Sequence, residues 1–412
     1  MIGYITKCQI CQHEPLTPIL ALGHHATVHA HLNKEQLHNP EITYPLNLVL
    51  CKNCGLSQLD YIGDPNVIFP LEYPYQTGMT NMLIRNFKQL ADELEAKYAL
   101  KPNDLIVDIG SNDGTLLQPF KDKKMRVLGI EPTNTAKIAN KNGITTIQEY
   151  FTKSVADLAV KTYGKAKIIT LTNAFAHIFN LYEIMEGIEL MLDKDGIFVS
   201  ESQYMVDAME KTAYDTIYHE HIRFYTLTTL QELFKRTGFS LVDAERISAA
   251  GGSIRVFAKK GKFKMSKRAE KIIANEKKIG ACDAKILKSF AKKSIQAKYS
   301  LLNLLSGLKK EGKQIVTIGA PARGNSLLNF VKIDQDLIDY ACEKGDSPKI
   351  GLYTPGTHIP IVDEKILFKN QPEYALVLSW HIGDELMKKL RKLGYEGKFI
   401  IPLPEPHIVK NI

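Results

Sequence analysis

Four side chains that can transfer protons stand side by side in the run Tyr218-His219-Glu220-His221. A further candidate, His177, comes a few residues after the apolar run of an expected strand. A single histidine is more often structural than catalytic, but four such groups in succession are typical of a site that moves protons. The residue types therefore predict general acid–base chemistry.

Two pairs of cysteines have the spacing of metal knuckles, Cys8 with Cys11 and Cys51 with Cys54. Four thiolates complete the tetrahedral shell of zinc at about 2.3 Å per bond and leave no position open for catalysis. Two disulfides are the alternative, which the lack of a secretory signal disfavours. The spacing therefore predicts one structural zinc ion in an N-terminal module.

A glycine-containing loop, Asp108-Ile-Gly-Ser-Asn-Asp-Gly114, follows a buried apolar run. It lacks the three glycines of a dinucleotide fingerprint. It resembles instead the first motif of class I S-adenosylmethionine methyltransferases, with Asn112 at the middle glycine. Glu131 follows the next strand and has the chemistry to accept both ribose hydroxyls. The predicted cofactor-binding residues are Asp108, Gly110, Asn112, Asp113, Gly114, Glu131, Pro132 and Asn173.

Apolar runs alternate with helical patterns along most of the chain, which predicts an α/β protein with largely parallel sheets. A helix is expected from residue 80, four strands between 104 and 200, and a closing hairpin at 240–258. Residues 265–311 have helical periodicity. Strands at 314–318, 337–342, 375–379 and 399–401 predict a second, smaller α/β unit. The predicted domains are a zinc module (1–70), a Rossmann-like methyltransferase domain (71–262), a helical connector (263–312) and a C-terminal α/β domain (313–412).

The net charge of +8 over 412 residues is unevenly distributed. The segment 259–313 carries +13 and the remainder −5, so the excess belongs to the connector, where a lysine-rich solvated helix face is the ordinary explanation. No run is long and apolar enough to span a bilayer, and the N-terminus lacks the pattern of a secretory signal. We therefore expect a cytoplasmic protein with no membrane partner.

Taken together, these motifs resemble the nucleotide-sugar C-methyltransferases that install branching methyl groups on deoxysugars, such as the C-3 methyltransferases of the tetronitrose and mycarose pathways. The resemblance covers essentially the whole chain. It includes the cysteine pairs, the cofactor loop, the segments that hold His177 and His221, and two C-terminal motifs at 319–325 and 351–360. The C-terminal motifs are the most specific, because methyltransferases at large do not have them.

The resemblance implies a role for each candidate catalytic residue. His221 is the expected base that removes a proton next to a ketone, and Tyr218 and Glu220 orient it or the sugar. His177 is a candidate donor to the enolate oxygen. His219 is an alternative base, and an active-site tyrosine is either Tyr73 or Tyr75, both of which have aromatic packing as an alternative role.

The C-terminal motif at 319–325 supplies the candidate substrate-binding residues Arg323 and Asn325. Arg323 replaces a lysine expected in many relatives. A cation in a glycine-containing loop that opens a helix suits a diphosphate. The alternative for Arg323 is an interdomain salt bridge.

The predicted activity is therefore S-adenosylmethionine-dependent C-methylation of a nucleotide-linked keto-deoxysugar, with carbon 3 of a 4-keto sugar as the family's commonest site. One alternative is an RNA methyltransferase that uses the zinc module and the basic segment to bind RNA. The basic segment has few aromatic residues, and no RNA-binding module is visible, so we expect no nucleic-acid partner. The other alternative is a scaffold without activity, against which the cofactor loop and the Tyr218–His221 run argue.

Overall fold

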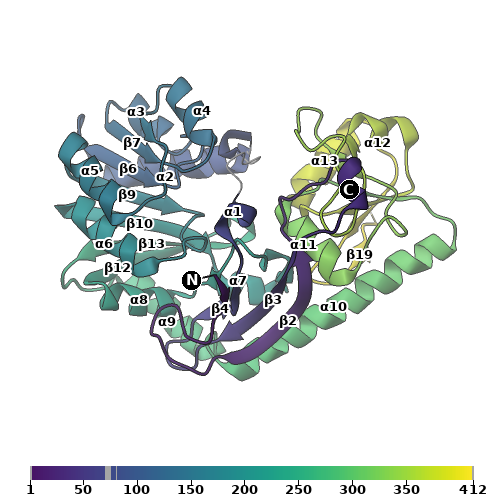
Figure 1. Cartoon of the computed structure of the whole chain (residues 1–412), viewed down its shortest axis with the longest axis horizontal. Coiled ribbons are helices and arrows are strands. Elements are labelled where there is room, and N and C mark those ends of the chain that lie inside the picture. The colour runs from purple at the N-terminus through teal and green to yellow at the C-terminus, as the bar shows by residue number, and fades with distance from the viewer. Residues whose placement is uncertain (1, 70–75, 80, 411–412) are drawn as a thin grey trace.

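The computed structural model describes residues 2–69, 76–79 and 81–410. Figure 1 shows two α/β units side by side, with the N-terminal module below and between them and a long helix running beneath the second unit. The predicted fold class is confirmed: a zinc module, a methyltransferase sheet and a smaller C-terminal α/β unit follow one another along the chain. No helix in the described ranges is long and apolar enough to cross a membrane.

The N-terminal module is a small antiparallel sheet with irregular loops. Its strand order is β11-β4-β3-β2, so one strand of this sheet, β11 (Arg223–Phe224), comes from the methyltransferase part of the chain. This pairing joins the cysteine module to the strand that follows Tyr218–His221. The elements of the module are β1 (Gly3–Tyr4), β2 (Thr17–Ala26), η1 (Glu35–His38), β3 (Thr43–Leu50), β4 (Ser57–Leu59), β5 (Tyr61–Ile62) and α1 (Pro65–Ile68).

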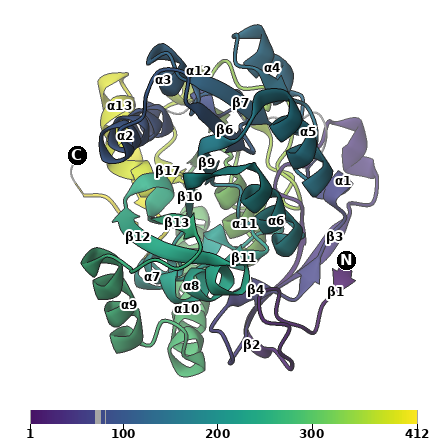
Figure 2. The ribbon, with the colours of Figure 1, turned by 90° about the vertical axis from the view of Figure 1, so that its left-hand side faces the viewer.

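The central sheet has seven strands in the order β12-β13-β10-β9-β6-β7-β8. Its first five strands along the chain are parallel, and the β12–β13 hairpin adds β13 antiparallel to β10. Figure 2 views this sheet with helices on both sides. The strands are β6 (Leu105–Ile109), β7 (Arg126–Ile130), β8 (Thr146–Ile147), β9 (Ala166–Thr172), β10 (Leu192–Gln203), β12 (Phe239–Ile247) and β13 (Ser253–Lys260).

Parallel strands that are covered on both faces are rich in apolar side chains. All five residues of β6 are buried, and four of them are apolar, the exception being Asp108. The helices that cover the sheet and the short turns around it are η2 (Thr77–Met79), α2 (Asn81–Tyr98), α3 (Gln118–Asp122), α4 (Thr135–Lys141), α5 (Lys153–Tyr163), α6 (Leu181–Met191), α7 (Met205–Glu210), η3 (Tyr214–Thr216), α8 (Leu227–Arg236) and η4 (Ala249–Gly251).

The connector contains two helices, α9 (Lys267–Ile279) and α10 (Ala284–Lys310), where the sequence predicts continuous helical periodicity. Gly280 ends α9 in the left-handed conformation (φ 68°), and the Asp283 side chain caps α10 by accepting the N–H of Lys285. One face of α10 is buried, whereas Ile286 near its start is 40% exposed.

The C-terminal unit has six strands in the order β16-β15-β14-β17-β18-β19, of which only β19 is antiparallel to its neighbour. The predicted strand at 337–342 is wrong over its first four residues, because the carbonyl of Asp334 accepts the N–H groups of Leu337 and Ile338 in a turn. The elements are β14 (Ile315–Ile318), α11 (Ala322–Val331), β15 (Ala341–Glu343), β16 (Ile361–Asp363), α12 (Lys365–Asn370), β17 (Tyr374–Val377), η5 (Trp380–Ile382), α13 (Gly383–Lys392), β18 (Lys398–Ile401) and β19 (His407–Ile408).

Candidate active site

The cofactor loop leaves β6 through three residues with positive φ: Gly110 at 73°, Asn112 at 48° and Gly114 at 81°. A side chain at Gly110 would lie 2.9 Å from the Cβ of Ala174, and one at Gly114 would lie 3.0 Å from Ile144. Glycine is therefore required by both backbone and space, whereas asparagine tolerates the left-handed region. The substitution of Asn112 for the middle glycine of the motif leaves the shape of the loop intact.

Two carboxylates lie at the ends of neighbouring strands beside this loop. Asp108 accepts a hydrogen bond of 2.6 Å from the hydroxyl of Thr170, and burial raises the pKa of its carboxyl group to about 7. Glu131 accepts the backbone N–H of Asn112 at 3.0 Å and both the N–H and the hydroxyl of Thr133, at 2.9 and 2.7 Å. The Glu131 carboxylate is thus fixed at the edge where parallel strands end, next to Pro132.

Polar side chains of the loop hold the short η2 turn against it. The Asn112 carboxamide oxygen accepts the N–H of Thr77 at 2.9 Å, and Asp113 accepts the N–H of Gly78 at 2.8 Å. On the far side of the loop, Asn173 has a φ of 56° and donates its N–H to the carbonyl of Glu201 at 2.7 Å.

This arrangement fits S-adenosylmethionine, the cofactor that the loop predicts. The positive-φ backbone permits close approach by a ligand, and Glu131 offers a carboxylate in position to accept ribose hydroxyls. Gly110, Glu131 and Asn173, from three successive strand ends, are the residues that would hold the cofactor. The roles of the individual residues stay predictions.

The Tyr218–His221 run folds into a tight turn that joins the tyrosine and the last histidine. The Tyr218 hydroxyl lies 2.8 Å from His221 Nε2, and His221 Nδ1 lies 2.7 Å from the carbonyl of Thr216. A carbonyl only accepts, so Nδ1 carries the proton and Nε2 accepts the Tyr218 hydroxyl. Burial lowers the pKa of His221 to about 4, so its imidazole is neutral at pH 7.

His177 and Glu220 lie directly beside this pair. The rings of His177 and His221 are 4.9 Å apart, and His177 also stacks on Phe69 at 5.5 Å. Loss of hydration keeps the pKa of His177 well below its usual value. Glu220 lies 4.0 Å from His177 Nδ1 and 3.3 Å from Nε2 of His29. The structure thus brings His177, Tyr218, Glu220 and His221 together, and their catalytic roles stay predictions.

His29, which is not among the predicted site residues, reaches this cluster from the loop after β2. The same loop binds the C-terminal unit, because the carbonyl of Val28 accepts the Asn325 amide at 2.8 Å and Leu32 pairs with Tyr353. Burial lowers the pKa of His29 to about 3. The only signal in the sequence was the run His29-Ala-His31 beyond the predicted cysteine knuckles, which by itself indicates no particular site.

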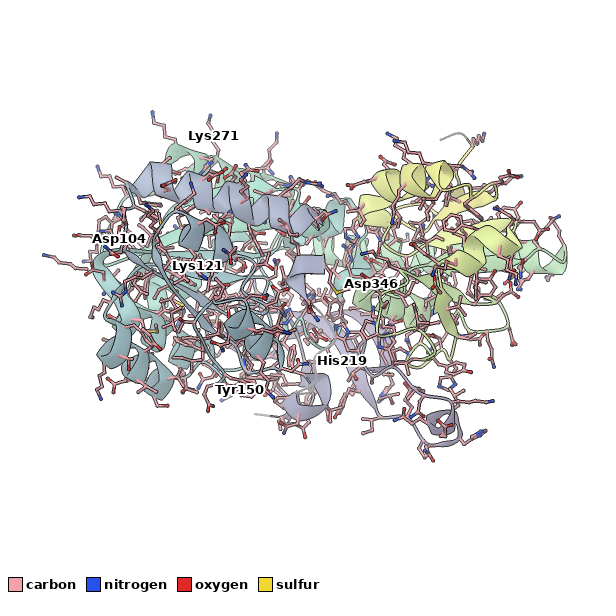
Figure 3. All side chains as sticks on the ribbon, turned by 90° about the horizontal axis from the view of Figure 1, so that it is seen from above. Asp104, Lys121, Tyr150, His219, Lys271 and Asp346 are labelled. Carbon is pink, nitrogen blue, oxygen red and sulfur yellow. The ribbon has the colours of Figure 1, made fainter. Side chains whose placement is uncertain are left out.

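The other candidates take different places. His219 turns to the N-terminal sheet, where its Nε2 lies 3.2 Å from the carbonyl of Tyr44 (Figure 3). Tyr73 and Tyr75 lie outside the described residues. The hydrogen bond of His219 thus goes to the N-terminal sheet and not to the His177–His221 pair, and the tyrosine prediction stays untested.

Arg323 lies in the first turn of α11 and not in the preceding loop. Its guanidinium makes a bidentate pair with Asp215 at 3.0 and 3.1 Å and lies 5.2 Å from the Trp380 ring, whose Nε1 also donates to Asp215. Ser326 of the same helix donates to the carbonyl of Ile217 at 2.7 Å. The structure therefore gives Arg323 the interdomain salt bridge that was its alternative, and a contact with substrate stays a prediction.

The four cysteines form one cluster in which all sulfur atoms lie within 4.8 Å of one another. None is in a disulfide. Backbone N–H groups of Ile10 and Cys11 point to the sulfur of Cys8 at 3.4 Å, as in a metal knuckle. The donor set, its compactness and these N–H groups fit a structural tetrahedral zinc ion held by Cys8, Cys11, Cys51 and Cys54.

Comparisons with known proteins agree with this architecture. Three family models match consecutive parts of the chain: "Putative zinc binding domain" at residues 8–69, "Methyltransferase domain" at 79–244 and "C-methyltransferase C-terminal domain" at 248–404. The C-methyltransferase NovU of Streptomyces niveus is 30% identical over 409 residues, which is 98% of this chain and 97% of the relative.

Solved methyltransferase structures match part of the chain at low similarity. The magnesium protoporphyrin IX methyltransferase ChlM of Synechocystis with bound S-adenosylhomocysteine is 14% identical, with a TM-score of 0.33, over 43% of this chain and 83% of that chain. An S-adenosylmethionine-dependent methyltransferase of Anabaena variabilis is 15% identical, with a TM-score of 0.33, over 42% and 83%. These scores are too low to support an argument.

The match to NovU and the three family models instead cover the chain from end to end. They confirm an S-adenosylmethionine-dependent C-methyltransferase with a zinc-binding module, as the motifs indicated. The chain belongs to the C-methyltransferase family that includes NovU.

Proposed function

We propose that this enzyme methylates a carbon next to the ketone of a nucleotide-linked deoxysugar, with carbon 3 of a 4-keto sugar as the site. The observation that carries the proposal is the Tyr218–His221 pair, in which Thr216 fixes the tautomer that leaves Nε2 without a proton. A proton next to a ketone is removed rapidly only if a base and a donor to the enolate oxygen are both in place.

His221 is the base in this proposal, and Tyr218 lies on the path of the proton. The proton ends on Nε2, either directly or through the Tyr218 hydroxyl, which is 2.8 Å away. The pKa of His221 is low because the ring is buried. A developing enolate beside the ring favours the imidazolium, so the pKa of His221 rises as the proton is transferred.

His177 is the donor to the enolate oxygen. It is neutral because its pKa is well below 6.5, and a neutral imidazole has one N–H to donate. Glu220 lies between His177 and His29 and sets the orientation of both rings. S-adenosylmethionine supplies an electrophilic methyl group on its sulfonium. Within the proposal, Arg323 and Asn325 shape the interdomain side of the sugar pocket through Asp215 and Val28.

The test is incubation with S-adenosylmethionine labelled in its methyl group and a panel of 4-keto nucleotide sugars that differ in nucleotide and in sugar. We expect transfer to carbon on at least one of them and to none of the matched 4-hydroxy sugars, which cannot form an enolate. Transfer to 4-hydroxy sugars at an equal rate, or to oxygen, would contradict the proposal.

A further inference from the structure

Two arginine side chains are almost completely buried in this protein, and their surroundings differ. Arg255, which is 1% exposed, lies 3.1 Å from Glu201 and 3.0 Å from Glu93. Arg223, also 1% exposed, has no carboxylate within ion-pair distance anywhere in the described ranges. A buried guanidinium without a counter-charge costs several kcal/mol in general, so a negative group must balance it.

The polar contacts of Arg223 lead to the cysteine cluster. Its Nε donates to the Tyr225 hydroxyl at 3.1 Å, and one terminal nitrogen donates to the Gln9 side-chain oxygen at 2.5 Å. The other terminal nitrogen, Nη2, is buried with no hydrogen-bond partner among the described residues. Gln9 stands between Cys8 and Cys11 in the first knuckle.

Further hydrogen bonds hold this knuckle against β11. The Gln9 amide donates to the carbonyl of Ile222 at 3.2 Å, and the Gln9 backbone N–H donates to Gln58 at 2.8 Å. Gln58 lies opposite Arg223 in the register of β4 and β11. Burial lowers the pKa of the Arg223 guanidinium, and the neighbouring Tyr225 and Cys8 side chains oppose that lowering.

A zinc ion with four thiolates carries a net charge of −2, and this cluster is itself largely buried. Both the anionic metal centre and the lone guanidinium are costly to bury alone, and each lowers the cost of the other when they are close. Groups in the second shell of a metal orient its ligands and change its affinity, usually by 10- to 100-fold on mutation.

We propose that Arg223 is the counter-charge of the zinc–thiolate centre and positions the active-site turn relative to the metal. Arg223 is two residues after His221, so the cation that balances the thiolates lies on the strand that follows the proposed base. Loss of the metal leaves Arg223 buried without an anion and loosens β11 from the knuckle. Zinc would therefore maintain the geometry of the His221 turn without touching substrate.

The first test compares zinc affinity in Arg223→Met, Arg223→Lys and the matched control Arg255→Met, by competition with a chromophoric chelator. We expect Arg223→Met to bind zinc 10- to 100-fold more weakly. Arg223→Lys, which keeps the charge, should stay within about threefold of the native protein. Arg255→Met should also bind zinc normally, because its partners are Glu201 and Glu93. Native affinity in Arg223→Met, or equal losses in all three variants, would overturn the proposal.

A second readout reports the field at the sulfur atoms directly. In the cobalt-substituted protein, loss of a nearby positive charge raises the energy of the thiolate electrons and moves the sulfur-to-cobalt charge-transfer band to longer wavelength. We expect this shift in Arg223→Met and not in Arg255→Met. If Arg223→Met does not fold, the band of Arg223→Lys decides: a native position supports the charge role, and a shift to longer wavelength overturns it.

Discussion

The two α/β units use the same strand–loop–helix corner for different purposes. In the methyltransferase unit, β6 leads through Gly110 into the cofactor loop, and Glu131 follows the next strand, β7. In the C-terminal unit, β14 leads through Gly319, with a φ of 79°, to α11, and the second strand ends in Glu343. Both glutamates accept a backbone N–H from their loop, at 3.0 Å in the first unit and 2.7 Å in the second.

The difference lies in the charges around these corners. Glu343 lies 3.5 Å from Lys349, and Arg323, which follows the second loop, is paired with Asp215. Glu131 makes no ion pair within the described residues, so its carboxylate can serve a ligand. Asp108 lies two residues before Gly110. The corresponding residue of β14, two before Gly319, is the uncharged Thr317. One corner is thus kept for a ligand, and the other is occupied by the protein's own side chains.

The largest effect should come from the histidine that the methyltransferase unit uses for chemistry. His221→Asn removes the base and should lower kcat by about 10³-fold, within the usual range for general bases, while S-adenosylmethionine affinity stays native. Kinetics and calorimetry measure the two quantities. The control, His381→Asn, changes a half-buried histidine of the C-terminal unit beside Arg323 and should retain most activity. Near-native turnover of His221→Asn would contradict the assignment.

The second prediction concerns the occupied corner. Arg323→Met leaves Asp215 buried without its cation and should lower the free energy of unfolding by about 3 kcal/mol, measured in urea. If Arg323 serves only as the interdomain pair, the affinity for S-adenosylmethionine stays native. An unchanged free energy of unfolding would show that the Arg323–Asp215 pair does not stabilise the fold. A loss of nucleotide-sugar affinity alone, in a variant that stays stable, would favour the diphosphate role.

The third prediction compares the two glutamates directly. Glu131→Gln removes a charged acceptor and should weaken S-adenosylmethionine binding by about 10-fold or more, since hydrogen bonds to charged groups contribute about 1.5–3 kcal/mol. The matched change Glu343→Gln should leave the dissociation constant unaltered. Isothermal titration of both variants checks this. Equal losses would mean that the two corners do not differ in function.

The last prediction is a pH dependence of stability at the first corner. The pKa of Asp108 is raised from 3.8 to about 7 in the folded protein. The folded state therefore holds this proton where the unfolded state has lost it, and the carboxyl group destabilises the fold increasingly as pH rises from about 4 to about 7. Asp108→Asn, which can still accept the Thr170 hydroxyl, should gain stability relative to the native protein between pH 5 and pH 8. Urea unfolding of Thr317→Asn, measured at both pH values, is the control.

Local sequence predicted most of this architecture because its signals are short in range. The cysteine knuckles, the Gly110–Gly114 loop and the alternation of strands and helices each follow from residues that are close in the chain. The break at Gly280 was also visible, as a glycine within a helical pattern, but residues 265–311 were read as continuously helical. The strand at 337–342 was partly wrong because a turn at Asp334 overrides its apolar residues.

The long-range contacts of the site were not predictable from one sequence. His29 meets Glu220, and Arg323 meets Asp215, across 191 and 108 positions respectively, and only the packing of three units brings them together. The Tyr218–His221 pair was easier, because both residues lie in one turn. Which of the two histidines in that run contacts Tyr218 depended on the turn itself, which directs His219 to Tyr44.

The most direct test of the central claim is the exchange of the proton next to the ketone. A 4-keto nucleotide sugar is incubated in deuterated water with the enzyme and S-adenosylhomocysteine, which has no methyl group to transfer, and is followed by proton NMR. The account predicts loss of the carbon-3 proton signal with the native enzyme and a rate near that of the uncatalysed exchange with His221→Asn. Equal rates of exchange with the two proteins would contradict it. It would also be contradicted if the native enzyme methylated a 4-keto sugar but never exchanged the carbon-3 proton of that sugar.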